Sequence, residues 1–401
     1  MSFKLFGRYE LCQKVATGGM AEVFLAVQRG RSGFVREVII KRLFRHLADD
    51  ARVLRLFKNE AQLLAALDHP GLPQVYEFGA AEGQWYIAME HVRGHSVAQL
   101  VDAAHQSGIP IPFPVACSVV IQAADALGYA HDYRHERSGL ADVVHRDVTP
   151  QNLMVGKTGH IKVLDFGVAQ TAEGTGTNSG VVTGTYAYMP PEQVQGRKLD
   201  RRVDVFALGV ILYELTTQSR LFPGTDLEVM TAVVEQEPPL PSSRREQYPS
   251  DLEEVVLRAL AKERIKRTAT AADLEKELET IAARHGWLIG SHTLRDYLGS
   301  VGAWLPPQAE VAFDDPALGL ATAGRSSGSS PADALVEHFD DESLLEDIRM
   351  LSEPLGSSAP PPARSTLEFA PDALSADLGE ARSTRARPST TPSPSREKTP
   401  K

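Results

Sequence analysis

The residues whose types and spacing could do chemistry lie near the middle of the chain. Asp147 is followed five positions later by Asn152, and Asp165 stands 18 positions after Asp147. Apolar segments at 153–155 and 161–164 flank a glycine-containing turn, so we expect a hairpin that brings the two clusters together. Oxygen ligands that converge beside phosphate groups suit Mg²⁺, a hard cation. Asp147 could then orient an incoming hydroxyl group.

Two weaker signals lie nearer the N-terminus. Gly18 and Gly19 follow an expected strand, and a glycine turn lets backbone N–H groups approach phosphate oxygens without an obstructing Cβ. An ordinary hairpin turn is the alternative, and a Walker loop is excluded because no Gly-Lys-Ser/Thr follows. Lys41 ends an apolar strand, where it could be a solvent-facing edge residue or a cation that grips phosphates. Glu60 lies in an expected helix and could pair with Lys41.

The elements that must position these side chains change in type along the chain. Residues 9–86 alternate short apolar runs with turns, which predicts strands, and one helical run at 49–67 interrupts them. From Ser96 onward the apolar spacing is mostly helical. The expected helices span 97–104, 115–131, 203–217, 227–236, 251–261 and 271–283. Strands first and helices later predict an α+β protein with a β-rich small lobe and a helical large lobe.

These motifs occur in an order that resembles the eukaryotic-type (Hanks-type) protein kinases, and most closely their bacterial serine/threonine branch. The likeness runs from about Tyr9 to Ala283, roughly two thirds of the chain. The segments that carry it are Thr17–Val23, Val38–Lys41, Val144–Asn152, Asp165-Phe166-Gly167, Gly184–Glu192, Asp204–Gly209 and Arg267. The resemblance implies a bilobal protein-kinase-like fold, with an N-lobe at about 9–90 and a C-lobe at about 94–283. It also implies ATP- and Mg²⁺-dependent transfer of the γ-phosphate to Ser or Thr hydroxyls of protein substrates.

The resemblance assigns a role to each matching residue. Lys41 would hold the α- and β-phosphates and be oriented by Glu60. Asn152 and Asp165 would bind Mg²⁺, and Asp147 would be the catalytic base. The other nucleotide contacts would come from the loop residues Gly18 and Gly19, the ring-sandwiching Val23, Ile39 and Met154, gatekeeper-like Met89, and the backbone of Glu90 and Val92. Structural roles would fall to Thr185, Asp204 and the pair Glu192 and Arg267.

The sequence departs from the family pattern most clearly at Thr149, where Ser/Thr kinases carry a lysine that contacts the γ-phosphate. Threonine brings no positive charge, and losing such a contact can cost on the order of 10² to 10³ in rate. A working enzyme is favoured because the other catalytic positions are retained. The alternative is an ATP-binding pseudokinase scaffold that signals through its tail. Small-molecule phosphotransfer is disfavoured because residues 184–192 resemble a peptide-docking segment.

Three milder departures accompany Thr149. Ala16 and Ala21 replace two loop glycines, and both are small enough for the loop to close. Ile39 replaces an alanine under the adenine, where it could narrow the pocket. Pro190 replaces the alanine of an Ala-Pro-Glu motif, and Glu192 is retained.

Arg146, directly before Asp147, suggests regulation by phosphorylation. In the family such an arginine usually binds a phosphate on the activation segment, and this contact orders an otherwise mobile loop. Thr177 and Ser179 are the expected autophosphorylation sites, with Thr175 and Thr183 as further candidates. A plain flexible loop is the alternative for this stretch.

Composition limits the partners and the compartment. The formal net charge of -10 argues against a general nucleic-acid-binding role. Cys12 and Cys117 are too few for a disulfide framework, so we expect a reducing, cytoplasmic setting. No window approaches 18 uninterrupted apolar residues, so no membrane span is expected, and residues 1–10 lack the apolar core of a signal peptide.

The regions outside the kinase-like part are expected to be an N-terminal extension at 1–8, a connector at 284–305 and a disordered Pro/Ser-rich tail at 306–401. Residues 301–380 carry a net charge of -12 and residues 381–401 carry +5. Such segregated charge with low hydrophobicity predicts disorder. Residues 333–351 have helical apolar spacing, which indicates either a transient helix or an amphipathic docking segment that folds onto a partner or onto the main domain.

Overall fold

The computed structural model describes residues 4–30, 33–134, 143–166 and 185–302. Several predictions lie outside these described residues. They are the four phosphorylation sites Thr175, Thr177, Ser179 and Thr183, and the tail with its expected helix at 333–351.

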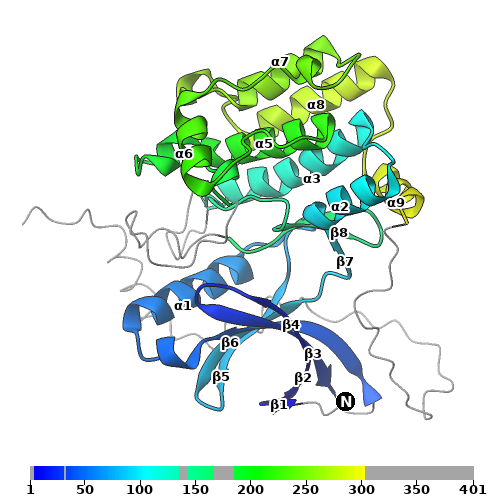
Figure 1. Cartoon of the computed structure of the whole chain (residues 1–401). Coiled ribbons are helices and arrows are strands. Elements are labelled where there is room, and N and C mark those ends of the chain that lie inside the picture. The colour runs from blue at the N-terminus through cyan, green and yellow to red at the C-terminus, as the bar shows by residue number, and fades with distance from the viewer. Residues whose placement is uncertain (1–3, 31–32, 135–142, 167–184, 303–401) are drawn as a thin grey trace, which may run out of the picture. The chain divides into compact units, whose positions relative to one another are not determined.

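A six-stranded antiparallel sheet occupies the N-terminal part (Figure 1). Its strands are β1 (Lys4–Phe6), β2 (Tyr9–Thr17), β3 (Ala21–Arg29), β4 (Val35–Leu43), β5 (Val75–Ala81) and β6 (Gln84–Glu90), in the order β1-β2-β3-β4-β6-β5. Val38 and Ile40 are fully buried in an apolar cluster on one face of β4. Because side chains alternate along a strand, Ile39 and Lys41 point to the opposite face.

Helix α1 (Ala51–Ala66) lies beside this sheet (Figure 1). Asp50 caps its N-terminus, because the carboxylate accepts hydrogen bonds from the backbone N–H groups of Arg52 at 2.8 Å and Val53 at 3.3 Å. Its buried residues recur at helical spacing and are Phe57, Glu60, Ala61, Leu63 and Leu64. The helix predicted at 49–67 is therefore present, and Glu60 is on its buried stripe.

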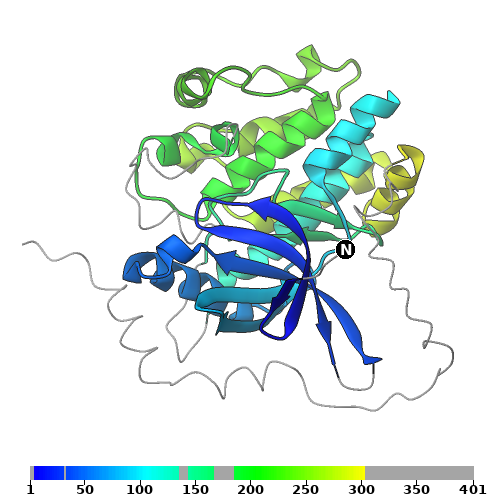
Figure 2. The same cartoon turned by 60° about the horizontal axis from the view of Figure 1, so that its bottom comes forward.

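The C-terminal part is mainly helical. Its α-helices are α2 (Val97–Ser107), α3 (Phe113–Asp132), α4 (Pro191–Val194), α5 (Arg202–Thr217), α6 (Asp226–Glu235), α7 (Ser250–Ala259), α8 (Ala271–His285) and α9 (Ser291–Ser300). Short 3₁₀ turns occur at Arg45–Leu47 in the N-terminal part and at Thr185–Tyr188, Pro241–Ser243 and Arg264–Lys266 here. Helix α3 packs against α5, α8 and α9 (Figure 1 and Figure 2). The predicted α+β class, with a β-rich and a helical lobe, is confirmed.

Helix α3 has the length and apolar composition of a membrane span, and it is the only such helix in the described part of the chain. However, 61% of its apolar 18-residue window is buried inside the fold. Its contacts with α5 and α8 are those of a core helix.

A second, three-stranded antiparallel sheet carries the hairpin predicted from the sequence. Its strands are β7 (Gly94–Ser96), β8 (Leu153–Gly156) and β9 (Ile161–Val163), in that order. Leu153 pairs with Val163, and Val155 pairs with Ile161. All four of these side chains are buried, so the hydrophobic pattern sets the register of the hairpin.

Two segments differ from the expected extension and connector. Strand β1 adds an edge to the sheet because Phe6 is fully buried and packs edge-on against Tyr86, with 5.4 Å between ring centroids. Helix α8 extends to His285, and α9 follows it, packs on α3 and buries Leu294 and Leu298. The buried residues of β1 and α9 are few and lie at the two ends of the kinase-like region. No sequence motif marks them, so the sequence did not predict these two elements.

Candidate active site

Lys41 is the centre of an ion-pair network that joins three separate elements. Its Nζ atom lies 2.5 Å from Oε1 of Glu60 on α1 and 3.0 Å from Oδ1 of Asp165, which follows β9. The side chains of Lys41 and Glu60 are 12% and 2% exposed, whereas that of Asp165 is 48% exposed. The structure therefore brings together three residues that the sequence assigned to one site, and it leaves the Asp165 carboxylate accessible.

The β8–β9 hairpin holds Asn152 and Asp165 at its open end. The backbone N–H of Leu164 donates to the carbonyl of Asn152 at 2.8 Å and closes this end. The side-chain Nδ2 of Asn152 donates to the backbone oxygen of Asp147 at 2.8 Å and to its Oδ2 at 3.1 Å. Because the amide nitrogen is used in this way, the amide oxygen is the atom that can ligate a cation.

Asp204, fully buried in the first turn of α5, fixes the backbone that leads into Asp147. Its two carboxylate oxygens accept hydrogen bonds from the backbone N–H groups of His145 at 2.9 Å and Arg146 at 2.8 Å. Nε2 of His131 lies 2.7 Å from the same carboxylate. Arg146 has a φ of 68°, a left-handed conformation that costs free energy in a residue with a side chain. The hydrogen bonds to Asp204 compensate for this cost and hold the turn before Asp147.

His145 links this turn to the segment that carries Asp165. Its Nε2 lies 2.9 Å from the carbonyl oxygen of Leu164, and its ring centroid lies 4.6 Å from that of Phe166. Asp165 itself has a φ of 53°, again in the left-handed region. Two strained residues therefore flank the catalytic region, where such strain is commonly concentrated.

The electrostatics keep the site in the form that binds phosphate and a metal ion. The Lys41 ammonium lowers the pKa of Asp165 and outweighs the opposing effect of partial desolvation, so this residue remains a carboxylate. Burial would lower the pKa of Lys41, but the negative charges of Asp165 and Glu60 outweigh it and raise this pKa. Asp165 and Asn152 thus supply a carboxylate oxygen and an amide oxygen beside a fixed cation. This donor set fits Mg²⁺, which prefers oxygen ligands and binds few protein groups.

The residues expected around the adenine ring lie on three neighbouring strands of the first sheet and on β8 of the second. In the sheet register, Val23 on β3 pairs with Lys41 on β4, and Ile39 on β4 pairs with Met89 on β6. Met154 on β8 alternates with two core residues and faces the other way from them. These four side chains therefore come from the strand that carries Lys41, from the two strands beside it and from the catalytic hairpin.

Two backbone donors in the expected nucleotide set are already used. The N–H of Gly18 donates to the carbonyl of Ala21 at 2.8 Å and closes the turn between β2 and β3. The N–H of Glu90 donates to the carbonyl of Gln74 at 2.8 Å. Contacts to a nucleotide therefore fall to Gly19 in the turn, and to the carbonyl of Glu90 and the backbone of Val92 in the segment after β6.

The structure also places the residues assigned to structural roles. Arg267 donates from Nη1 and Nη2 to the two carboxylate oxygens of Glu192, at 2.7 and 3.1 Å, and both side chains are buried. Thr185 begins the 3₁₀ turn that precedes Glu192. Thr149 is buried next to Asp147, and its carbonyl accepts a hydrogen bond from the backbone N–H of Asn152 at 3.0 Å.

Comparison with known proteins identifies the architecture that carries this site. Residues 9–278 match the family described as the protein kinase domain. The chain belongs to the protein kinase family. Members of this family use ATP and Mg²⁺, and the matched residues of this kinase include all those that surround Lys41.

The kinase is similar to several characterised bacterial proteins. It is 42% identical over 282 residues to the tyrosine-protein kinase MasK of Myxococcus xanthus, covering 70% of this chain and 44% of MasK. It is 40% identical over 281 residues to the serine/threonine-protein kinase PknB of Mycobacterium leprae, covering 68% and 43% of the two chains. The aligned kinase region thus spans less than half the length of these relatives.

A solved structure shows the same fold. A mutant PknI kinase domain from Mycobacterium tuberculosis superimposes with a TM-score of 0.52 and 26% sequence identity. The match covers 70% of this kinase and 98% of the PknI chain. The shared fold therefore includes both the sheet and the helical part.

Sequence reasoning missed the loop after α1, which anchors this kinase's two parts to each other. The His69 ring stacks on Tyr129 of α3, with 5.0 Å between centroids, and its Nε2 lies 3.4 Å from Asp125. The backbone N–H of Asp68 donates to the Tyr129 hydroxyl at 3.2 Å. Because this loop ends α1, these contacts hold Glu60 in place. Only the tertiary structure reveals them, since no periodic pattern marks the loop.

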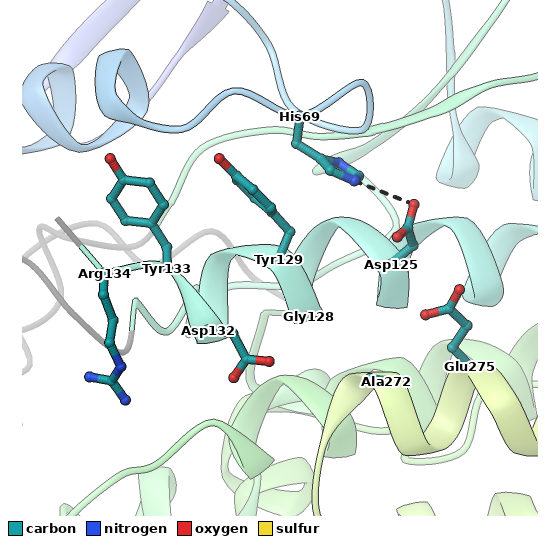
Figure 3. A pocket seen from close by; sticks show the side chains of 9 residues that line it. All are labelled: His69, Asp125, Gly128, Tyr129, Asp132, Tyr133, Arg134, Ala272 and Glu275. Atoms are coloured by element: carbon teal, nitrogen blue, oxygen red, sulfur yellow. Dashed lines mark ion pairs between the residues drawn. The ribbon is translucent and has the colours of Figure 1, made fainter.

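A hollow of about 470 Å³ lies beside this contact (Figure 3). It is lined by His69, Asp125, Gly128, Tyr129, Asp132, Tyr133, Arg134, Ala272 and Glu275. None of these residues belongs to the nucleotide- or metal-binding set. Three carboxylates line the hollow. Asp132 forms an ion pair with Arg201 at 2.7 Å, and Asp125 lies 3.4 Å from the His69 ring, so two of the three already have a basic side chain as a partner.

Proposed function

We propose that this kinase transfers the γ-phosphate of ATP to Ser or Thr hydroxyl groups of protein substrates. The observation that carries the proposal is the double contact of Lys41 with Glu60 and Asp165. In active protein kinases the lysine–glutamate ion pair and the metal-binding aspartate must both be in place. The retained Asn152 and Asp147 complete the same set.

The geometry divides the work of phosphoryl transfer among these side chains. Lys41 supplies a fixed cation for the α- and β-phosphates, and Glu60 prevents it from swinging away. Asp165 and Asn152 would hold Mg²⁺, which neutralises negative charge on the phosphates when it is bound. Asp147 orients the acceptor hydroxyl and receives its proton. Phosphoryl transfer depends mainly on such positioning and charge neutralisation, so these residues suffice in outline.

The acceptor class is the finer part of the proposal. The relative MasK is named a tyrosine kinase, whereas PknB and PrkC of Bacillus subtilis, 33% identical over 280 residues, are named serine/threonine kinases. The Gly184-Thr185 motif supports Ser/Thr specificity. Thr149, in place of the usual lysine, supports neither class.

We also propose that the kinase phosphorylates itself at Thr177 or Ser179, with Thr175 and Thr183 as further sites. Arg146 supports this proposal. Among the residues that the structure describes, its buried Nε has no hydrogen-bond partner. A phosphate on the activation segment would give this guanidinium a charge-assisted partner.

We propose a cytoplasmic kinase in bacterial signalling that acts on protein substrates. Its low cysteine content favours a reducing compartment. The segment 333–351 is proposed as a docking site for a partner, and its removal should weaken recognition of that partner without changing phosphoryl transfer to a short peptide.

Incubation of the full chain with Mg²⁺ and ATP, followed by phosphopeptide mapping, tests the function. The Asp147→Asn variant is the control, because it removes the proton acceptor and leaves the Lys41 network unchanged. We expect phosphoserine or phosphothreonine in the wild type and none in the variant. Phosphotyrosine alone would overturn the acceptor class. Nucleotide binding without any phosphoryl transfer would support the alternative of a pseudokinase scaffold. The missing positive charge at Thr149 would then be the structural reason for the lack of transfer.

A further inference from the structure

The carboxylate of Glu37 on β4 forms ion pairs with two residues of the segment that follows β6, His91 and Arg93. Oε2 of Glu37 lies 2.8 Å from Nδ1 of His91 and 2.8 Å from Nε of Arg93. The Glu37 side chain is 18% exposed and that of His91 is 21% exposed, so the contact between these two is largely shielded from water, whereas the Arg93 side chain is 57% exposed. The two partners flank Val92, one of the residues expected to bind the adenine edge.

Glu37 lies on the face of β4 that serves the nucleotide. Along a strand, positions two apart share a face, so Glu37 is on the same side as Ile39 and Lys41. One strand therefore carries a phosphate-binding cation, a residue for the adenine ring and a carboxylate that holds the segment beside the ring. Burial alone would raise the pKa of Glu37, but the hydrogen bonds and charges of Arg93 and His91 together lower it, so the carboxylate is charged.

The other side of the same segment is tied to the catalytic hairpin. Oε2 of Glu90 lies 2.9 Å from Nζ of Lys162 on β9. The backbone carbonyl of Arg93 accepts a hydrogen bond from the N–H of Lys157 at 3.1 Å, in the turn after β8. Lys157 and Lys162 hold the segment from the hairpin side, and Glu37 holds His91 and Arg93 from the sheet side, beyond the last β4–β6 pair of Val38 with Glu90.

We propose that Glu37 is a positioning residue for nucleotide binding, which fixes the backbone of Val92 through His91 and Arg93. The inference rests on the proposed function and deepens it, since it explains how the adenine-binding backbone is held. Loss of the carboxylate frees the segment and raises the entropy cost of ordering it around a nucleotide. The effect therefore falls on affinity for the nucleotide and not on the phosphoryl-transfer step.

The test is Glu37→Gln, which retains the size of the side chain and removes its charge. We expect nucleotide affinity, measured by calorimetry with ADP and Mg²⁺, to weaken about three- to tenfold, as for loss of a partly shielded charged hydrogen bond. The KM for ATP should rise by the same factor, and kcat should stay within about twofold. Arg93→Gln, at an exposed position, should show a smaller change in the same direction. The charge-swapped pair Glu37→Arg with Arg93→Glu should recover part of the loss.

The matched control is Glu10→Gln, which breaks the 2.9 Å ion pair between Glu10 on β2 and Arg29 on β3 of the same sheet and leaves both partners of Glu37 in place. It should leave nucleotide affinity unchanged. Unaltered affinity in Glu37→Gln, or an equal loss in Glu10→Gln, would overturn the inference. Failure of the proposed function is a separate result. It would appear as wild-type protein that binds ADP but transfers no phosphate, and in that case the affinity comparison still decides the role of Glu37.

Discussion

Arg267 and Glu192 form a buried ion pair with two parallel hydrogen bonds, at 2.7 and 3.1 Å. The guanidinium also donates to the backbone carbonyl of Arg202 at 2.9 Å and lies 5.0 Å from the ring centroid of Phe206. Because Arg267 itself lies in the loop before α8, this one side chain ties that loop to α4 and to the start of α5. Planar two-point contacts of this kind suit arginine and not lysine.

Arg267→Lys should destabilise the kinase strongly, because it loses the second hydrogen bond and leaves a buried carboxylate partly unpaired. Disruption of a buried pair costs about 3–5 kcal/mol, and we expect a loss near the lower end. Urea unfolding followed by circular dichroism measures it. Lys266→Met is the control, because Lys266 pairs with Glu263 at an exposed position and should cost under about 1 kcal/mol. Equal losses in the two variants would contradict the structural role of Arg267.

Lys41→Met should reduce phosphoryl transfer by at least about 100-fold, because it removes the only cation that contacts Asp165 in the described part of the site. Glu60→Gln should have a smaller effect, since Lys41 keeps its contact with Asp165. Initial rates with a generic protein acceptor provide the measurement. Glu22→Gln breaks ion pairs with Lys14 and Arg42 in the same sheet and should leave the rate within about twofold. A rate in Lys41→Met equal to the wild type would exclude the proposed mechanism.

Thr149→Lys should raise kcat by about tenfold if charge at this position limits the rate. The reason is that a lysine ammonium would stabilise the negative charge of the transferred phosphoryl group. Thr149→Met matches the length of lysine without its charge and should give no increase. Unchanged or reduced kcat in Thr149→Lys, with an unchanged melting temperature, would show that Lys41 and the metal ion already neutralise the phosphates.

The acid stability of the kinase should depend on Asp204. Burial alone would raise the pKa of this carboxyl, but the hydrogen bond and charge of His131, together with His145 and Arg146, lower it. Because the folded-state pKa is lowered, its stabilising effect is fully present above the unfolded-state pKa of about 3.9 and is lost as the pH falls through the folded value. The difference in unfolding free energy between the wild type and Asp204→Asn should therefore be largest above about pH 4 and shrink below it. A difference that is constant from pH 7 to pH 2 would contradict this assignment.

The sequence predicts the catalytic hairpin well because two independent patterns agree there. Apolar alternation in 153–155 and 161–163 sets the strands, and Gly156 and Gly159 set the turn, so the positions of Asn152 and Asp165 follow. Glu37 could not be predicted in the same way. A lone carboxylate on a strand has no pattern, and its partners His91 and Arg93 lie more than 50 positions away. The contact between His131 and Asp204 could not be predicted for the same reason, because it forms only when α3 packs against α5.

Helix α9 was missed for a different reason, since its buried residues follow the last kinase-like motif and are few. Leu294, Tyr297 and Leu298 are buried, with polar residues between them. Their significance appears only in the contact of α9 with α3 and with the turn of the catalytic hairpin.

Gly159 shows how closely α9 and that turn approach each other. It has a φ of 81°, and a Cβ atom at this position would lie 1.9 Å from the carbonyl oxygen of Ser291. Gly159→Ala should therefore force α9 or the turn to move, in addition to the cost of about 1–2 kcal/mol for a left-handed alanine. Gly286→Ala isolates that second cost, because Gly286 has a φ of 66° and nothing lies within 4 Å of the added Cβ. Unfolding free energies should show a loss in Gly159→Ala that exceeds the loss in Gly286→Ala by at least about 1 kcal/mol, in the range for overpacked sites.

The backbone N–H of Lys157, in the same turn as Gly159, donates to the carbonyl of Arg93 in the segment that carries Val92. Gly159→Ala should therefore also weaken ADP binding, whereas Gly286→Ala should not. Equal behaviour of the two variants would show that α9 and the catalytic hairpin are not coupled.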